Sequence, residues 1–163
     1  MLRATFAPSG FLWNYKGVDY TINETWAVDG DELAMKRALR KGTYRTLNVY
    51  FQKEIGGNLG YCYFPDTITP DSEEFWIDGC SILHTSVPGG AATNFNQGKT
   101  VTHEVGHWFG LYHTFQDGCD GGDEVADTPA QASPTSGCPV GRDSCPNLKG
   151  VDPIHNYMDY SYE

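Results

Sequence analysis

Residues 103–113 read HEVGHWFGLYH, and this stretch decides how the rest of the chain is interpreted. His103 and His107 are four residues apart, so on a helix they project from the same face, one turn apart. Neutral imidazoles at that spacing can both bind one Zn²⁺ ion at about 2.0–2.1 Å. Glu104 is rotated by about 100° from His103, so it can stand beside the metal as a base and need not be a ligand. The stretch therefore predicts a helix that carries a zinc site.

The third histidine of the stretch, His113, can reach the same ion only if the helix ends before it. A continuous helix would carry His113 about 15 Å along the axis from His103, at 1.5 Å per residue. Gly110 permits a positive φ, so we expect it to end the helix and let the chain turn back. The three histidines then leave a fourth position for water, as in catalytic sites, whereas structural zinc sites have four protein ligands.

Composition narrows the class of protein further. The chain has 163 residues, of which 39% are hydrophobic and 13% aromatic, which suits one compact domain with a buried core. Its net charge of −10 argues against a nucleic-acid partner, which needs a basic surface. No run of about 18 apolar residues is present, so we expect no membrane span. The first residues lack the apolar stretch of a signal peptide, so export would require a longer precursor.

The cysteines and the remaining histidines indicate less about the function of the chain. Five cysteines indicate an oxidising compartment, and the odd number leaves at least one thiol without a partner in the chain. Composition does not choose among the possible pairings. His84 and His155 each stand alone, and we expect a structural or surface role for both.

Hydrophobic periodicity predicts a mixed α+β architecture. We expect strands over residues 18–26, 46–52 and 80–86, the second with Leu47, Val49 and Phe51 on one face. A first helix begins after Asp29 or Asp31 and runs to about Lys41, with Gly42 as its stop. A second helix spans residues 97–109.

The character of the chain changes after His113. Residues 117–153 are rich in Gly, Pro, Asp, Ser and Cys and show almost no periodicity, so ions or disulfides are expected to hold them. We therefore expect a single domain over residues 1–163, with an N-terminal subdomain to about residue 110 and an irregular C-terminal subdomain over residues 111–163. Acidic side chains cluster early in this part, in an acidic loop that is either solvated or a calcium site; its members are Asp117, Asp120, Asp123, Glu124 and Asp127.

Several motifs together carry a family resemblance. Residues 103–113 match the long zinc signature of metzincins, and residues 156–160 (NYMDY) resemble their methionine-containing turn. Further matching stretches are residues 47–51, 60–62, 78–80, 87–90, 113–116, 127–129, 138–139 and 144–146. Over about residues 30–161 the chain resembles the pappalysin (cytophagalysin) family, which includes archaeal ulilysin and secreted fungal extracellular metalloproteases.

The resemblance implies a secreted zinc-dependent metalloendopeptidase with a metzincin-type domain built on a mixed twisted sheet. Glu104 would be the general base, Tyr160 a stabiliser of the transition state, and Met158 an apolar floor beneath the zinc. A peptide or protein substrate would lie extended along an edge strand near Cys80–Ser86. The alternative is a catalytically silent zinc-binding module derived from such a peptidase by truncation.

The resemblance also implies disulfides and a second metal. Its disulfides would be Cys62–Cys80 and Cys119–Cys145, with Cys138 unpaired. Its calcium ligands would be Asp123, Asp127 and the carbonyl groups of Val125 and Thr128. Compared with the family, the chain looks truncated at both ends, so the resemblance implies a longer precursor with a signal and a propeptide.

Overall fold

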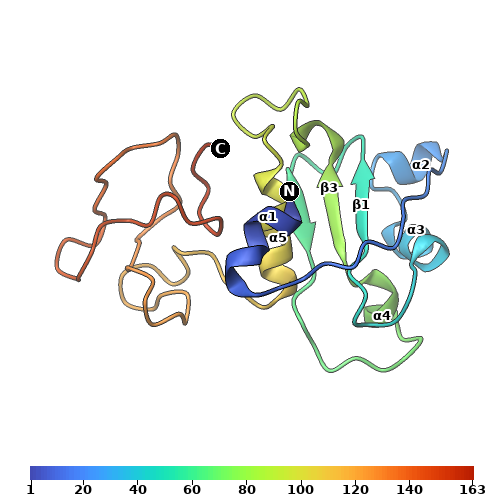
Figure 1. Ribbon diagram of the computed structural model, residues 1–163, viewed down its shortest axis with the longest axis horizontal. Helices are drawn as coiled ribbons and strands as arrows, with labels where there is room; N and C mark the ends of the chain where they lie inside the picture. The colour runs from blue at the N-terminus through green and yellow to red at the C-terminus, as the bar shows by residue number, and fades with distance from the viewer. The chain divides into compact units, whose positions relative to one another are not determined.

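The computed structural model describes every residue from 1 to 163 and divides into two compact units (Figure 1). The first unit, Met1–Trp108, contains all the helices and strands. The second unit, Phe109–Glu163, consists of turns, bends and irregular segments. The fold class is therefore α+β, as predicted. The longest helix has ten residues, and no helix has the length and apolar character needed to cross a membrane.

A three-stranded sheet forms the centre of the first unit. Its strands are β1 (Val49–Gln52), β2 (Gly60–Cys62) and β3 (Cys80–Leu83). β3 lies between the other two, parallel to β1 and antiparallel to β2 (Figure 1). The first three residues of β3 are fully buried, which is typical of a strand covered on both faces.

The central position of β3 corrects one expectation. The segment Cys80–Ser86 was expected to be an edge strand, but β3 is paired on both sides and ends at Leu83. A short 3₁₀ helix, η2 (His84–Ser86), follows it. The prediction was wrong because the resemblance assigned the edge strand to Cys80–Ser86, whereas the neighbours of a strand are set by pairing with segments far away in the sequence. The edges of the sheet are β1 and β2.

Helices cover both faces of this sheet. Helix α5 (Lys99–Trp108) packs against β2 and β3, and α1 (Leu2–Phe6) packs on α5. Helix α3 (Glu32–Leu39) contacts α4 (Glu73–Ile77), and both lie near β1 in Figure 1.

Local signals explain where α3 begins and ends. Asp31 caps the helix by accepting a hydrogen bond from the Ala34 N–H at 3.3 Å. Asp29, the other candidate cap, instead accepts hydrogen bonds from the side chains of Tyr61 and Gln52. After the helix, Gly42 has a φ of 75°, which suits a chain reversal.

The strand expected over residues 18–26 is absent. Residues Val18, Tyr20 and Ile22 are 63%, 90% and 102% exposed, and the helix α2 (Glu24–Ala27) begins inside the expected strand. Asn23 caps α2 by accepting from the Trp26 N–H at 3.1 Å. Alternation of side chains makes a strand only where a neighbouring strand supplies hydrogen bonds, and none lies beside this segment.

The exposed face of β1 also differs from expectation. Its buried residues are Tyr50 and Gln52, whereas Phe51 is 53% exposed. Gln52 is buried because its amide donates to Trp26 O at 2.9 Å and to Asp29 at 3.1 Å. The hydrogen bonds of Gln52 therefore decide which face of β1 is buried, and Phe51 is left on the exposed face.

A buried lysine joins α3 to this face of the sheet. The Lys36 ammonium is 2.7 Å from the Glu32 carboxylate and donates to Ile77 O at 2.8 Å. Three tyrosine rings have their centroids 4.8–5.5 Å from it: Tyr50, Tyr61 and Tyr63. Burial lowers the pKa of Lys36, although the nearby Glu32 opposes that shift. This face of the sheet is thus held by charge and aromatic contacts.

The second unit is held together without regular secondary structure. A disulfide joins Cys119 to Cys145. The side chain of Gln131, which is completely buried, bonds to four neighbours: Thr114, Ser133, Thr135 and Asp159. These links replace the backbone ladders that a helix or strand would provide.

We expect Lys36→Met to destabilise the protein by about 1.5–3 kcal/mol, because Glu32 and Ile77 O lose a hydrogen bond from a charged group. Lys53→Met is the control, since the Lys53 side chain is 68% exposed and should change stability by less than about 0.5 kcal/mol. Urea denaturation of both variants measures the difference. Identical midpoints for Lys36→Met and the parent would contradict the stabilising role.

Candidate metal centre

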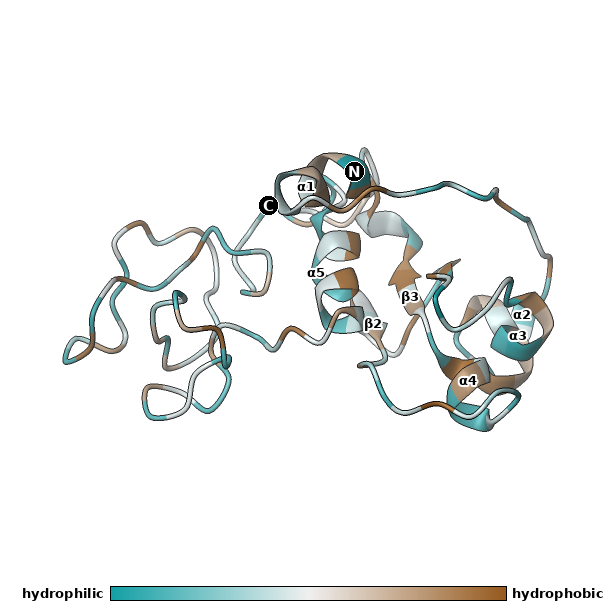
Figure 2. Cartoon of the chain, turned by 60° about the horizontal axis from the view of Figure 1, so that its bottom comes forward, coloured by the Kyte–Doolittle hydropathy of each residue, from teal (hydrophilic) through white to brown (hydrophobic).

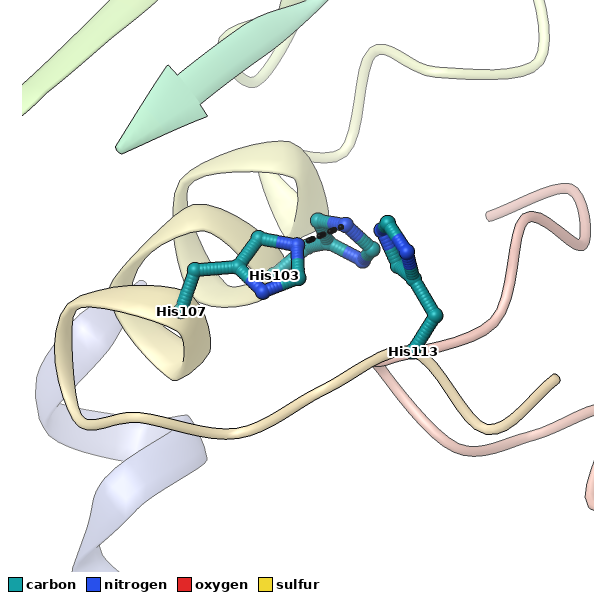
Figure 3. Close-up of side chains that lie close together, drawn as sticks. All are labelled: His103, His107 and His113. Atoms are coloured by element: carbon teal, nitrogen blue, oxygen red, sulfur yellow. Dashed lines mark hydrogen bonds between the residues drawn. The ribbon is translucent and has the colours of Figure 1, made fainter. Parts of the chain in front are cut away.

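Helix α5 presents two histidines from one face. The Nε2 atoms of His103 and His107 lie 3.1 Å apart, as the dashed line in Figure 3 shows. Two nitrogen ligands of a tetrahedral zinc ion, each about 2.0–2.1 Å from it, lie about 3.3 Å apart. The observed separation therefore suits two ligands of one ion. The ring of Phe64 packs on His107, with the two centroids 5.1 Å apart.

Buried valines and a hydrogen bond at its C-terminal end hold α5 on the sheet. Val105 is completely buried and Val101 is 8% exposed. At the end of the helix, the Trp108 indole N–H donates to the Asp78 carboxylate at 2.8 Å. The other Asp78 oxygen pairs with Arg40, also at 2.8 Å. The orientation of the two histidines follows from this seating.

The chain leaves the helix where the glycine was expected to end it. Helix α5 ends at Trp108, and Gly110 has a φ of 90°. His113 follows, and Figure 3 shows its ring turned towards those of His103 and His107. One ring nitrogen from each of the three histidines lies within 4.8 Å of the others. The structure thus brings together the three predicted ligands, and their donor set fits zinc.

Glu104 lies on the same helix as His103 and His107 and is buried, with 6% of its surface exposed. Burial raises the pKa of Glu104 to about 8. The cause is the loss of hydration of the charged form, and a bound cation would oppose this shift. A carboxylate held in a dry environment near a metal is well suited to accept a proton.

The turn that contains Met158 lies next to the segment that follows His113. Met158 O accepts from the Thr114 N–H at 3.2 Å, and Met158 is 5% exposed. Asn156 shapes the turn, since its side chain accepts from the Met158 N–H at 2.9 Å. Tyr160 extends from the same turn and is 48% exposed. Its ring meets that of His113 edge-on, with the centroids 4.8 Å apart.

Gln131 is a residue that sequence reasoning missed. Its oxygen accepts from the Thr114 hydroxyl at 2.8 Å, and its nitrogen donates to Asp159 at 2.9 Å. It thus links the residue after His113 to the residue after Met158. A glutamine within an irregular, polar segment carries no signal of this role, because its partners lie 17 and 28 residues away.

The acidic loop shows no cluster of three acidic ligands. Asp123 is buried, but its carboxylate accepts from the Val125 N–H at 3.0 Å. Val125 O in turn accepts from the Thr128 N–H at 3.1 Å, and Asp127 is exposed. The histidine group is the one set of three potential metal ligands from His, Cys, Asp and Glu side chains.

The cysteines and isolated histidines also have definite places. One disulfide joins Cys62 to Cys80, which are paired residues of β2 and β3, and the exposed Cys138 is free. The structure therefore contains both pairings that the resemblance implied. The His84 ring nitrogen lies 3.1 Å from Gln52 O, and His155 is exposed. Neither of these histidines belongs to the metal group.

A mixed sheet, a helix with paired histidines and a third histidine beyond a glycine turn together define the metzincin class of zinc peptidases. The sequence family described as pregnancy-associated plasma protein-A, peptidase family M43, matches residues 37–163. Because this match covers most of the chain, the chain belongs to that family.

Individual relatives agree with this assignment. An extracellular metalloprotease of Sordaria macrospora is 65% identical over 164 residues, covering 100% of this chain and 58% of the relative. Another, from Colletotrichum graminicola, is 66% identical and covers 100% of this chain and 59% of the relative. The chain thus spans somewhat over half the length of these relatives.

A solved structure shares the fold. Mature mirolysin of Tannerella forsythia, in complex with a cleaved peptide, has a TM-score of 0.63 and 36% sequence identity. The match covers 74% of this chain and 46% of mirolysin. The pappalysin resemblance and the metzincin-type fold are both confirmed.

We expect His113→Ala to weaken zinc binding by more than about 100-fold, because loss of even an outer-shell partner costs about 10–100-fold. The control is His155→Ala, which removes an exposed histidine outside the group. Competition with a fluorescent zinc chelator measures the affinities of both variants. Unchanged affinity in His113→Ala would remove this residue from the ligand set.

Proposed function

We propose that this chain is the catalytic part of a secreted zinc-dependent endopeptidase that hydrolyses peptide bonds in extended polypeptides. The observation that carries the proposal is the group of His103, His107 and His113 with the buried Glu104 beside it. Membership of a metallopeptidase family supports it. Extracellular relatives and two disulfides support a role outside the cell.

The three histidines would hold the zinc ion. When bound, the ion would polarise the scissile carbonyl group and lower the pKa of a water molecule. Glu104 would take the proton from this water as it attacks and pass the proton to the leaving amine nitrogen. Its burial supports this role, because few water molecules can reach the carboxylate and compete for the proton. Since no covalent intermediate forms on the protein, one base can serve both proton transfers.

Tyr160 is the proposed second stabiliser of the transition state. Its half-exposed side chain lies against His113, so a substrate bound near that ligand would come close to it. A phenol donating to the developing oxyanion would add to the electrostatic stabilisation. Met158, buried in the same turn, would supply an apolar packing surface.

Substrate is proposed to bind along β2. This strand is an edge of the sheet and runs beside α5, so it leaves backbone groups open for an added strand. The cleaved peptide bound to mirolysin supports a peptide ligand for this chain as well. The binding strand is therefore Gly60–Cys62 and its flanks, in place of the originally expected Cys80–Ser86.

We expect Glu104→Gln to retain zinc and the fold but to lower kcat by at least about 10²–10⁴-fold, the usual contribution of general acid–base catalysis. Glu54→Gln is the control, because its side chain is 65% exposed and pairs only with Lys53 among the ion pairs. Cleavage of a fluorogenic peptide library, with and without a zinc chelator, measures both variants.

Two outcomes of this experiment would contradict the proposal differently. A parent that cleaves in a chelator-sensitive way, with a Glu104→Gln variant equally fast, would remove Glu104 from the mechanism. A parent that binds zinc and cleaves nothing would favour the silent zinc-binding module.

We further propose that the acidic loop binds calcium through Asp123, Asp127 and the carbonyl groups of Val125 and Thr128. The supporting observation is the concentration of carboxylates within a loop that has no regular structure. Like charges so close together repel unless a cation neutralises them.

Calcium should therefore raise the melting temperature at fixed zinc, by an amount worth about 2.7 kcal/mol when calcium reaches 100 times its Kd. Asp127→Asn should reduce this shift, while the exposed Asp143→Asn should leave it unchanged. Thermal melts with calcium, with magnesium and without either ion make the comparison. An unchanged melting temperature at millimolar calcium would indicate a solvated acidic loop.

A further inference from the structure

The side chain of Glu104 lies directly against the backbone of β2 at Gly60. A Cβ atom placed on Gly60 would be 2.5 Å from Glu104 Cγ, 2.9 Å from Oε1 and 3.0 Å from Cδ. Carbon atoms that are not bonded do not approach so closely, because optimal contact is about 3.5–4.0 Å. Gly60 therefore leaves room that the Glu104 side chain occupies.

Space, and not backbone conformation, is what requires glycine here. Gly60 is absent from the residues with a positive φ, and it pairs with Ile82 in regular antiparallel geometry. The nearby Gly56 and Gly57 are different, since their φ values are 63° and 85° and a Cβ on either would meet nothing. Glycine within a strand weakens it and often marks a close approach of another group.

The hydrogen-bond register gives Gly60 a second role. The Leu83 N–H donates to Leu59 O at 2.8 Å, so Leu59 and Leu83 form a hydrogen-bonded pair across β2 and β3. In an antiparallel ladder such pairs alternate with pairs whose backbone groups point away from each other. The Gly60–Ile82 pair is of the second kind, so the N–H and C=O of Gly60 point to the free edge of the sheet.

The two observations meet at one residue. Glu104 occupies the space where a side chain of residue 60 would lie. The backbone groups of Gly60 point to the edge of the sheet, where an extended peptide would add. Glu104 also lies on α5, which packs on β2 and β3. Figure 2 shows this helix beside the sheet. The distance between Glu104 and the edge of β2 is therefore set by direct contact.

We propose that Gly60 is a positioning residue, whose missing side chain fixes the Glu104 carboxylate at the peptide-binding edge of β2. This inference rests on the proposed peptidase function, in which Glu104 transfers the proton. Catalytic geometry is sensitive to such contacts, because a displacement of about 1 Å can cost about 100-fold in rate. A methyl group at residue 60 would displace a flexible side chain rather than backbone, so the fold can survive the change.

The test begins with Gly60→Ala in the full zinc-loaded chain. We expect kcat to fall by about 10–100-fold, while KM and zinc affinity stay within about twofold of the parent. A merely structural role would instead change kcat, KM and zinc affinity together. The control is Glu54→Ala, a residue outside β2 and its flanks whose side chain is 65% exposed, which should retain parental kcat.

A double variant then shows whether the effect passes through Glu104. Gly60→Ala should lower the melting temperature when Glu104 is present and should leave it unchanged in a Glu104→Ala background, where the side chain it meets is gone. If Gly60→Ala alone fails to fold, the double variant should fold as well as Glu104→Ala. A double variant that fails in the same way would overturn the inference.

The outcomes separate this inference from the proposed function. A parent that cleaves and a Glu104→Gln variant that does not would uphold the peptidase. If Gly60→Ala then kept the parental kcat, positioning by Gly60 would be overturned and the peptidase would stand. A parent that cleaves nothing would remove both.

Discussion

The packing of α5 on β2 and β3 is the contact on which the candidate site depends. One turn of this helix carries two proposed ligands and the proposed base, so the seating of the helix orients all three at once. Val105 is completely buried beneath it, and Trp108 anchors its end to Asp78. Burial of apolar surface supplies the energy, while the hydrogen bond to Asp78 defines the rotation of the helix about its axis. The same packing places Glu104 directly against Gly60.

Polar contacts hold the parts of the chain that have too little apolar surface to form a conventional core. On the other face of the sheet, Lys36 is buried among tyrosines and paired with Glu32. In Phe109–Glu163, Arg142 pairs with the buried Asp152 at 2.9 Å, and Asp152 also accepts from Ser144. The disulfide Cys119–Cys145 limits the freedom of the unfolded chain and so compensates for the missing secondary structure. Irregular chain is thereby kept in one conformation beside the third histidine.

Local sequence signals predicted well wherever the cause of the structure is local. The helix expected over residues 97–109 is α5, and Gly110 ends it with a positive φ, because helical spacing and glycine act within one or two turns. Asp31 caps α3 for the same reason. Local signals failed where a partner far away in the sequence decides the structure. Residues 18–26 alternate like a strand but have no neighbour to pair with, and β1 buries Gln52 because Trp26 and Asp29 accept its hydrogen bonds. The strand β2 was not expected from periodicity, since three residues are too few to show a period.

The sequence by itself determined the chemistry of the site. The identities and spacing of His103, Glu104, His107, Gly110 and His113 are enough to place a metal ligand set and a base together, because helix geometry relates residues four apart. The tertiary structure decided what lies around them. It made β3 the central strand and β2 the edge, gave Gln131 its partners and set Gly60 against Glu104. These features depend on residues far apart in the chain, and the order of residues alone does not say which distant groups will pack against each other.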